Sequence, residues 1–254
     1  MSSYSRSRTW RLSWLGFFLG AAFLPALMAA DRGTKDAAAD PNAKTVDVFD
    51  GIRNGDIVVR FVPKDSREAR ITVENKTDKP LSVKLPDAFA GVPVLAQAGN
   101  AGGNRGGGAQ PAGGGGGMGG GMMYVPPEKA ESVKVPTVCL EHGKAEPRPS
   151  IPYEIKPIES VTDKPAVWEL CRMVGARQVS QRVAQAATWH LNNNMSWDQL
   201  AAKQARQLGG GSLPYFSPQE LRAAMQVADV AVQTAHERQQ QKQKSSSSSS
   251  ASGN

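Results

Sequence analysis

The sequence predicts an α+β protein in which an immunoglobulin-like β-sandwich is followed by a small helical region. Between residues 44 and 138, short alternating segments of apolar and polar residues are separated by turns of Gly, Asn, Asp and Pro, which is typical of an antiparallel β domain. Helical periodicity with clear start signals occurs only after residue 160. Strands that come first and helices that come last indicate segregated α+β architecture.

The expected strands are short and closely spaced. Residues 57–62 are rich in β-branched side chains and end at Pro63, and residues 132–138 contain Pro136, which would restrict that strand to a sheet edge. The alternating or β-branched pattern also predicts strands at 45–49, 69–74, 81–85, 92–96 and 122–125.

One segment inside the β domain has an extreme composition. Residues 99–121 hold 14 of the chain's 26 glycines and almost no large side chain. Such a segment buries too little apolar surface to offset the entropy of ordering it. It is therefore expected to be a disordered loop.

The rest of the chain divides into a proline-rich passage, a helical region and a polar tail. Residues 139–159 are expected to be extended, and residues 160–240 to be helical. A helix should begin at Ser196, where Gln199 three residues later completes a capping box. The last helix should begin with Ser217 as N-cap, Pro218 at the first helical position and Glu220 three residues after the cap. Residues 241–254, with their run of six serines, are expected to be disordered.

Residues 1–30 have the order of a secretory signal peptide. Three arginines precede an apolar run at 12–28, and Ala29 and Ala30 follow it. The alternative is that this segment is an uncleaved N-terminal anchor. Residues 31–43 are small and polar and are expected to be a linker before the β domain. No later segment is apolar enough to predict a membrane span. We expect an exported protein that is periplasmic, displayed at the cell surface or secreted.

Charge argues against nucleic acid as a partner. The chain carries a formal net charge of +7, of which three charges belong to the arginines of the signal peptide. The remaining charges are interspersed and form no dense basic stripe. An envelope or extracellular protein or a polysaccharide is the expected kind of partner, and nothing in the sequence calls for a cofactor.

The densest group of chemically capable residues is the stretch 137–144, Thr-Val-Cys-Leu-Glu-His-Gly-Lys, at the end of a predicted strand. Its Cys139 and the later Cys171 are the only two cysteines of the chain. In an exported protein such a pair indicates a disulfide, which would close a loop of roughly 30 residues and contribute about 3 kcal/mol. The alternative is two unconnected thiols packed as small apolar groups.

A zinc site is a further alternative. Two cysteines and two histidines can hold zinc tetrahedrally, and Cys-x-x-His is an acceptable local spacing. The four ligands would be Cys139, His142, Cys171 and His190.

Two resemblances concern the same region. Residues 185–189, Gln-Ala-Ala-Thr-Trp, resemble the Gln-x-Ala-x-Trp motif of thioester domains in bacterial surface adhesins. The resemblance implies a bond between the thiol of Cys139 and the side chain of Gln185, which would acylate a partner. The stretch Cys-Leu-Glu-His-Gly-Lys at 139–144 is also similar to uncharacterised exported bacterial proteins.

Together these observations predict a non-enzymatic exported protein that binds a partner or supports structure in the cell envelope. The alternative function is an adhesin-like protein that couples covalently to its partner through the Cys139–Gln185 thioester. A hydrolase using Glu141 and Glu146 as an acid–base pair is a third hypothesis.

Overall fold

The structure is a computed structural model. The residues that it describes are 43–94, 112–114, 121–206 and 209–251.

By its internal contacts the chain divides into two compact units, Met1–Asp36 and Ala37–Asn254, and every described residue belongs to the second unit. The predicted signal peptide, nearly all of the linker and most of the predicted glycine-rich loop lie outside the described residues.

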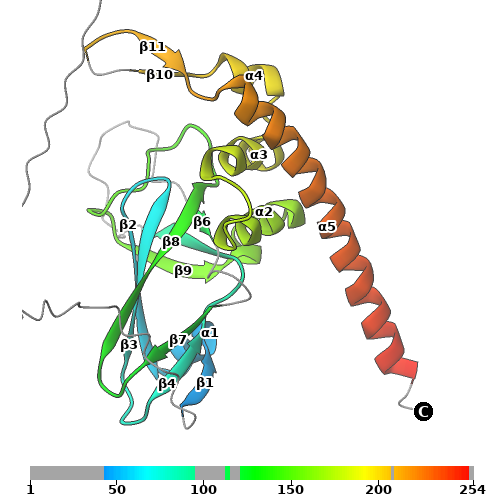
Figure 1. Cartoon of the computed structure of the whole chain (residues 1–254). Coiled ribbons are helices and arrows are strands. Elements are labelled where there is room, and N and C mark those ends of the chain that lie inside the picture. Colours follow the sequence, from blue (N-terminus) through cyan, green and yellow to red (C-terminus); the bar gives the residue numbers. More distant parts are fainter. Residues whose placement is uncertain (1–42, 95–111, 115–120, 207–208, 252–254) are drawn as a thin grey trace, which may run out of the picture. The chain divides into compact units, whose positions relative to one another are not determined.

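The described chain is α+β, with most strands before most helices (Figure 1). Its strands are β1 (Lys44–Asp47), β2 (Ile57–Pro63), β3 (Glu68–Asn75), β4 (Leu81–Lys84), β5 (Phe89–Pro93), β6 (Ala112–Gly114), β7 (Met122–Val125), β8 (Ala130–Cys139), β9 (Tyr153–Pro157), β10 (Gln204–Arg206) and β11 (Ser212–Pro214). Its helices are α1 (Val48–Asn54), the 3-10 turn η1 (Ile158–Ser160), α2 (Pro165–Gly175), α3 (Gln181–Asn193), α4 (Trp197–Ala202) and α5 (Pro218–Ala251).

Six strands form a closed antiparallel barrel in the order β2-β3-β8-β6-β5-β9. The predicted immunoglobulin-like β-sandwich is therefore wrong. Two strands of the barrel were not predicted because of their composition: β6 lies within the glycine-rich segment, and β9 lies within the proline-rich passage. The pairing of Phe61 on β2 with Tyr153 on β9 closes the barrel.

Strand β8 explains how the sheet curves into a barrel. Its first seven residues, up to Pro136, pair with β3, and its last three residues pair with β6. Pro136, which was expected to mark a sheet edge, instead lies where β8 changes partner. Proline cannot donate to a ladder, so its position at this change of partner leaves no interior ladder bond broken.

Aromatic side chains fill the barrel. The ring of Phe61 contacts Phe89 edge-on, with centroids 6.0 Å apart, and Tyr153 at 5.9 Å. Gly91 makes room for this ring, because a Cβ at Gly91 would lie 2.3 Å from Cε1 of Phe61. A second, three-stranded sheet in the order β1-β4-β7 adds Val46, Leu81, Val83 and Val125 to the same core cluster.

Helices α2, α3 and α5 lie to one side of the barrel, whereas α1 contacts β1, β2 and β4. Figure 1 shows α2 and α3 between the barrel and α5, and both contact β8 on one side and α5 on the other. The predicted helix starts at Ser196 and Ser217 are confirmed, since α4 has a complete capping box and α5 begins at Pro218. Helix α5 continues to Ala251, through residues that were expected to be disordered. None of the helices in the described residues is long and apolar enough to cross a lipid bilayer.

Candidate functional site

The cysteine-centred stretch lies where the barrel meets α3. Cys139 ends β8 and pairs with Ala112 of β6. On its other side β8 has lost its first partner, because the β3 ladder ends at Pro136. The N–H of Thr137 still donates to the carbonyl of Arg67, but the backbone groups that follow it on this side need new partners, since buried N–H and C=O groups are almost always hydrogen-bonded.

Side-chain amides of α3 are these partners. We call Gln181, Gln185, Asn192 and Asn193 the α3 amide row. Gln181 donates to the carbonyl of Thr137 at 3.2 Å, and Asn192 donates to the carbonyl of Leu140 at 2.7 Å. Asn193 accepts from the backbone N–H of His142 at 3.2 Å. The row continues the ladder of β8 after β3 has ended.

Gln185 makes the central and most complete contact of the row. Its Oε1 accepts from the backbone N–H of Cys139 at 2.8 Å, and its Nε2 donates to the carbonyl of Cys139 at 2.9 Å. Gln185 is only 2% exposed. The structure thus brings together the two residues of the thioester alternative, but the amide meets the backbone of Cys139.

Cys139 and Cys171 are both buried and free. Successive side chains of a strand point to opposite faces, and Cys171 packs with Val138 and Leu140, the two neighbours of Cys139. Cys139 belongs to a different cluster, with Trp189 and Leu170. The two thiols therefore lie on opposite faces of β8, and no disulfide joins them in this structure.

Burial raises the pKa of both thiols from 9.0 to about 12. The thiolate rather than the thiol is the nucleophile and the metal ligand. Both sulfurs are therefore protonated at neutral pH.

The two histidines of the zinc alternative lie in separate aromatic contacts. The rings of His142 and Trp189 are T-shaped, with centroids 4.8 Å apart. His190 stacks on Trp197 with centroids 4.2 Å apart, and its Nδ1 lies 2.8 Å from the carbonyl oxygen of Met195. Within the part of the chain that the structure describes, no three His, Cys, Asp or Glu side chains converge as a metal site would require.

A cluster of cations and aromatic rings lies beside His142 and was not foreseen from the sequence. The Nζ of Lys203 lies 2.9 Å from Nε2 of His142 and about 5 Å from the ring centroids of Trp189 and Tyr215. Burial lowers the pKa of His142, and the nearby Lys203 lowers it further. The pKa of Lys203 is also lowered by burial. A neutral His142 can accept a hydrogen bond from the ammonium group of Lys203 through its Nε2.

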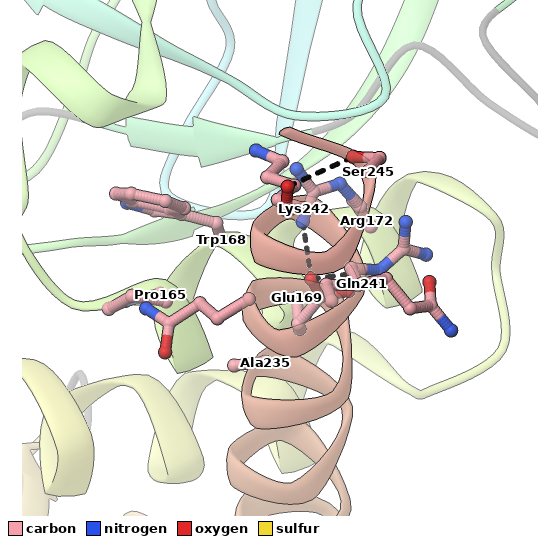
Figure 2. A pocket seen from close by; sticks show the side chains of 10 residues that line it. Pro165, Trp168, Glu169, Arg172, Ala235, Gln241, Lys242 and Ser245 are labelled. Carbon is pink, nitrogen blue, oxygen red and sulfur yellow. Dashed lines mark hydrogen bonds and ion pairs between the residues drawn. The ribbon is translucent and has the colours of Figure 1, made fainter. Parts of the chain in front are cut away.

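A surface pocket of about 330 Å³ lies between α2 and α5 (Figure 2). Pro165 and Trp168 line one part of it, and Glu169, Arg172, Arg238 and Lys242 line another. Glu169, with its side chain only 5% exposed, binds Arg172 at 2.6 Å and Arg238 at 3.0 Å. The sequence contained a signal for the first pair, an i,i+3 spacing on a helix, but none for Arg238.

Comparisons of the chain with models of known protein families, with curated proteins and with solved structures find no match. The fold and the site define an α+β protein built on a closed six-stranded barrel that is capped along one strand by a helix.

Proposed function

We propose that the chain is an exported, non-enzymatic protein of the cell envelope that acts by binding rather than by covalent chemistry. The observation that carries this proposal is the state of Cys139 and Gln185. The amide of Gln185 is engaged at both ends by backbone groups, and the thiol of Cys139 is buried with a pKa of about 12.

This arrangement supports a structural role for the residues that a covalent mechanism would use. Moving the Gln185 side chain toward the sulfur would leave the buried N–H and C=O of Cys139 unpaired, which costs about 1–3 kcal/mol for each group. The order of residues 1–30 supports export, and the open pocket between α2 and α5 supports a role in binding.

Expression of the full chain in a bacterial host, followed by cell fractionation and intact mass measurement, tests the proposal. We expect the protein in an envelope or extracellular fraction, without residues 1–30 and with two cysteines that react with iodoacetamide only after unfolding. Retention in the cytosol would contradict export.

The mass also separates the covalent alternatives. A thioester lowers the mass by one ammonia, and treatment with methylamine opens the thioester and adds the mass of methylamine. A disulfide lowers the mass by two hydrogens, and a reductant restores them. Either deficit would contradict the assignment of structural roles to these residues.

A further inference from the structure

We propose that the pocket between α2 and α5 binds an organic anion that combines a flat apolar body with a carboxylate, sulfonate or phosphate group. This inference gives the ligand class for the binding role proposed above, and it rests on that role. Three features of the pocket carry it: its charge, the fixed position of its arginines and its apolar wall.

The charge of the pocket favours an anion. Arg172, Arg238 and Lys242 contribute three positive charges, and Glu169 is the one acid among the residues that line it. The pocket is therefore positive even with the carboxylate counted. A partly enclosed site of one sign concentrates ligands of the opposite sign.

Glu169 holds the two arginines in place. Its Oε1 accepts a hydrogen bond from Nη1 of Arg172 and forms an ion pair with Nε of Arg238 at 3.0 Å. A guanidinium has five N–H groups, so contacts through one nitrogen of each arginine leave further donors for a ligand. Because both side chains are already fixed, a bound anion loses little affinity to the ordering of rotamers.

The other wall of the pocket suits a flat apolar group. Nε1 of Trp168 donates to the carbonyl of Thr162 at 2.9 Å, which fixes the orientation of the indole. In Figure 2, Trp168 and Pro165 lie on one side, and the paired Glu169 and Arg172 lie on the other. A simple inorganic anion would leave the indole face uncovered, whereas an aromatic acid would occupy both walls.

Calorimetric titration of the full chain with 2-naphthoate tests the proposal. We expect 2-naphthoate to bind with an affinity that falls as salt is added, because the contacts are partly exposed ion pairs. The uncharged 2-naphthamide and inorganic phosphate should each bind about tenfold more weakly, or not measurably. The amide can contact only the apolar wall, and phosphate can contact only the wall that carries the arginines.

Variants on α5 locate the binding. Lys242→Gln should lower the affinity for 2-naphthoate about three- to fivefold, and Arg238→Gln should lower it about tenfold, as expected for charge-assisted contacts. The matched control is Arg222→Gln, an exposed residue on the same helix that does not line the pocket, and it should leave the affinity unchanged. Trp168→Leu should lower the affinity for 2-naphthoate but not the affinity for phosphate.

Three results would overturn the inference: no binding of 2-naphthoate, equal binding of 2-naphthamide, or equal losses in Arg222→Gln and Lys242→Gln. Lys242 is exposed, so its variant remains informative if Arg238→Gln or Trp168→Leu unfolds the chain. The titration does not depend on export. If 2-naphthoate does not bind but the protein is found in an envelope or extracellular fraction, only the ligand class is rejected. If 2-naphthoate binds but the protein stays in the cytosol, only the envelope role is rejected.

Discussion

Single side chains replace backbone partners in this protein. Gln185 supplies one donor and one acceptor to Cys139, as a neighbouring strand would do. The resemblance to a thioester motif named these two residues together, and the structure places them in contact. The resemblance could not indicate that Gln185 contacts the backbone of Cys139, because this contact depends on where β3 ends.

Replacing Gln185 with methionine should destabilise the fold. Methionine has a similar length, but it leaves the buried N–H and C=O of Cys139 without partners, so we expect the free energy of unfolding to fall by about 2–4 kcal/mol. Urea denaturation measures the loss. Gln226→Met, on the exposed face of α5, is the matched control and should change the stability by less than about 0.5 kcal/mol. Similar values for the two variants would argue against the amide row.

A close approach of backbone to side chain joins β6 to α2. A Cβ added to Gly113 would lie 2.7 Å from Sγ of Cys171 and 2.8 Å from Cδ2 of Leu140. Gly113 therefore lets α2 pack directly on the barrel. In the sequence it is one of many glycines in a low-complexity run, and nothing local distinguishes it.

A double-mutant cycle tests this contact. Gly113→Ala should cost about 1–3 kcal/mol through overpacking. In a Cys171→Ala background the same change should cost less, because the sulfur that it meets is gone. The coupling energy should exceed about 0.5 kcal/mol, and additive effects would show that the two residues do not meet.

At the scale of elements, helix starts are the best-predicted features. The N-cap of α5 depends on residues within one turn: Ser217 accepts from the N–H of Glu220, and Glu220 accepts from the N–H of Ser217. Glu220 also binds Arg182 of α3. Burial raises the pKa of Glu220, but the hydrogen bonds from Arg182 and Ser217 outweigh this effect and hold the pKa below its usual value.

Two substitutions separate the cap from the ion pair. Glu220→Gln keeps an acceptor for Ser217 and loses the charge that binds Arg182, whereas Glu220→Ala loses both. We expect losses in unfolding free energy of about 0.5 and about 1–2 kcal/mol respectively, measured by thermal or urea unfolding. Glu237→Ala, exposed on the same helix, should be nearly neutral. Equal losses for the two Glu220 variants would mean that the ion pair alone matters.

The whole molecule should lose stability at alkaline pH. The pKa of each thiol is about 12 in the folded chain and 9.0 in the reference state. Above about pH 9 the unfolded chain releases these protons first, so the free energy of unfolding should fall as pH rises from 9 toward 12, and it should not change on this account below pH 9.

Urea unfolding at a series of pH values measures this effect. The pKa of Tyr153 is also raised by burial to about 12, so the wild type must be compared with a Cys139→Ala, Cys171→Ala variant. The variant should show a shallower decline above pH 9. Parallel curves would mean that the thiols are not buried in the protonated form.

The sequence by itself determined the features that depend on neighbouring residues. These are the starts of α4 and α5, the short strands from β2 to β4, and the succession of strands and then helices. Caps, turns and alternation act within a few residues, so their physical causes can be recognised in the chain alone.

Only the tertiary structure decided what depends on distant segments. Strand β6 exists because β5 and β8 offer it ladder partners, and β9 exists because β5 and β2 do. Glycine and proline make both segments poor strands in isolation. The same long-range pairing closes the barrel, places Cys139 and Cys171 on opposite faces of β8, and turns Gln185 into a backbone partner. The free energy of these contacts is gained only once segments far apart in sequence have been brought together.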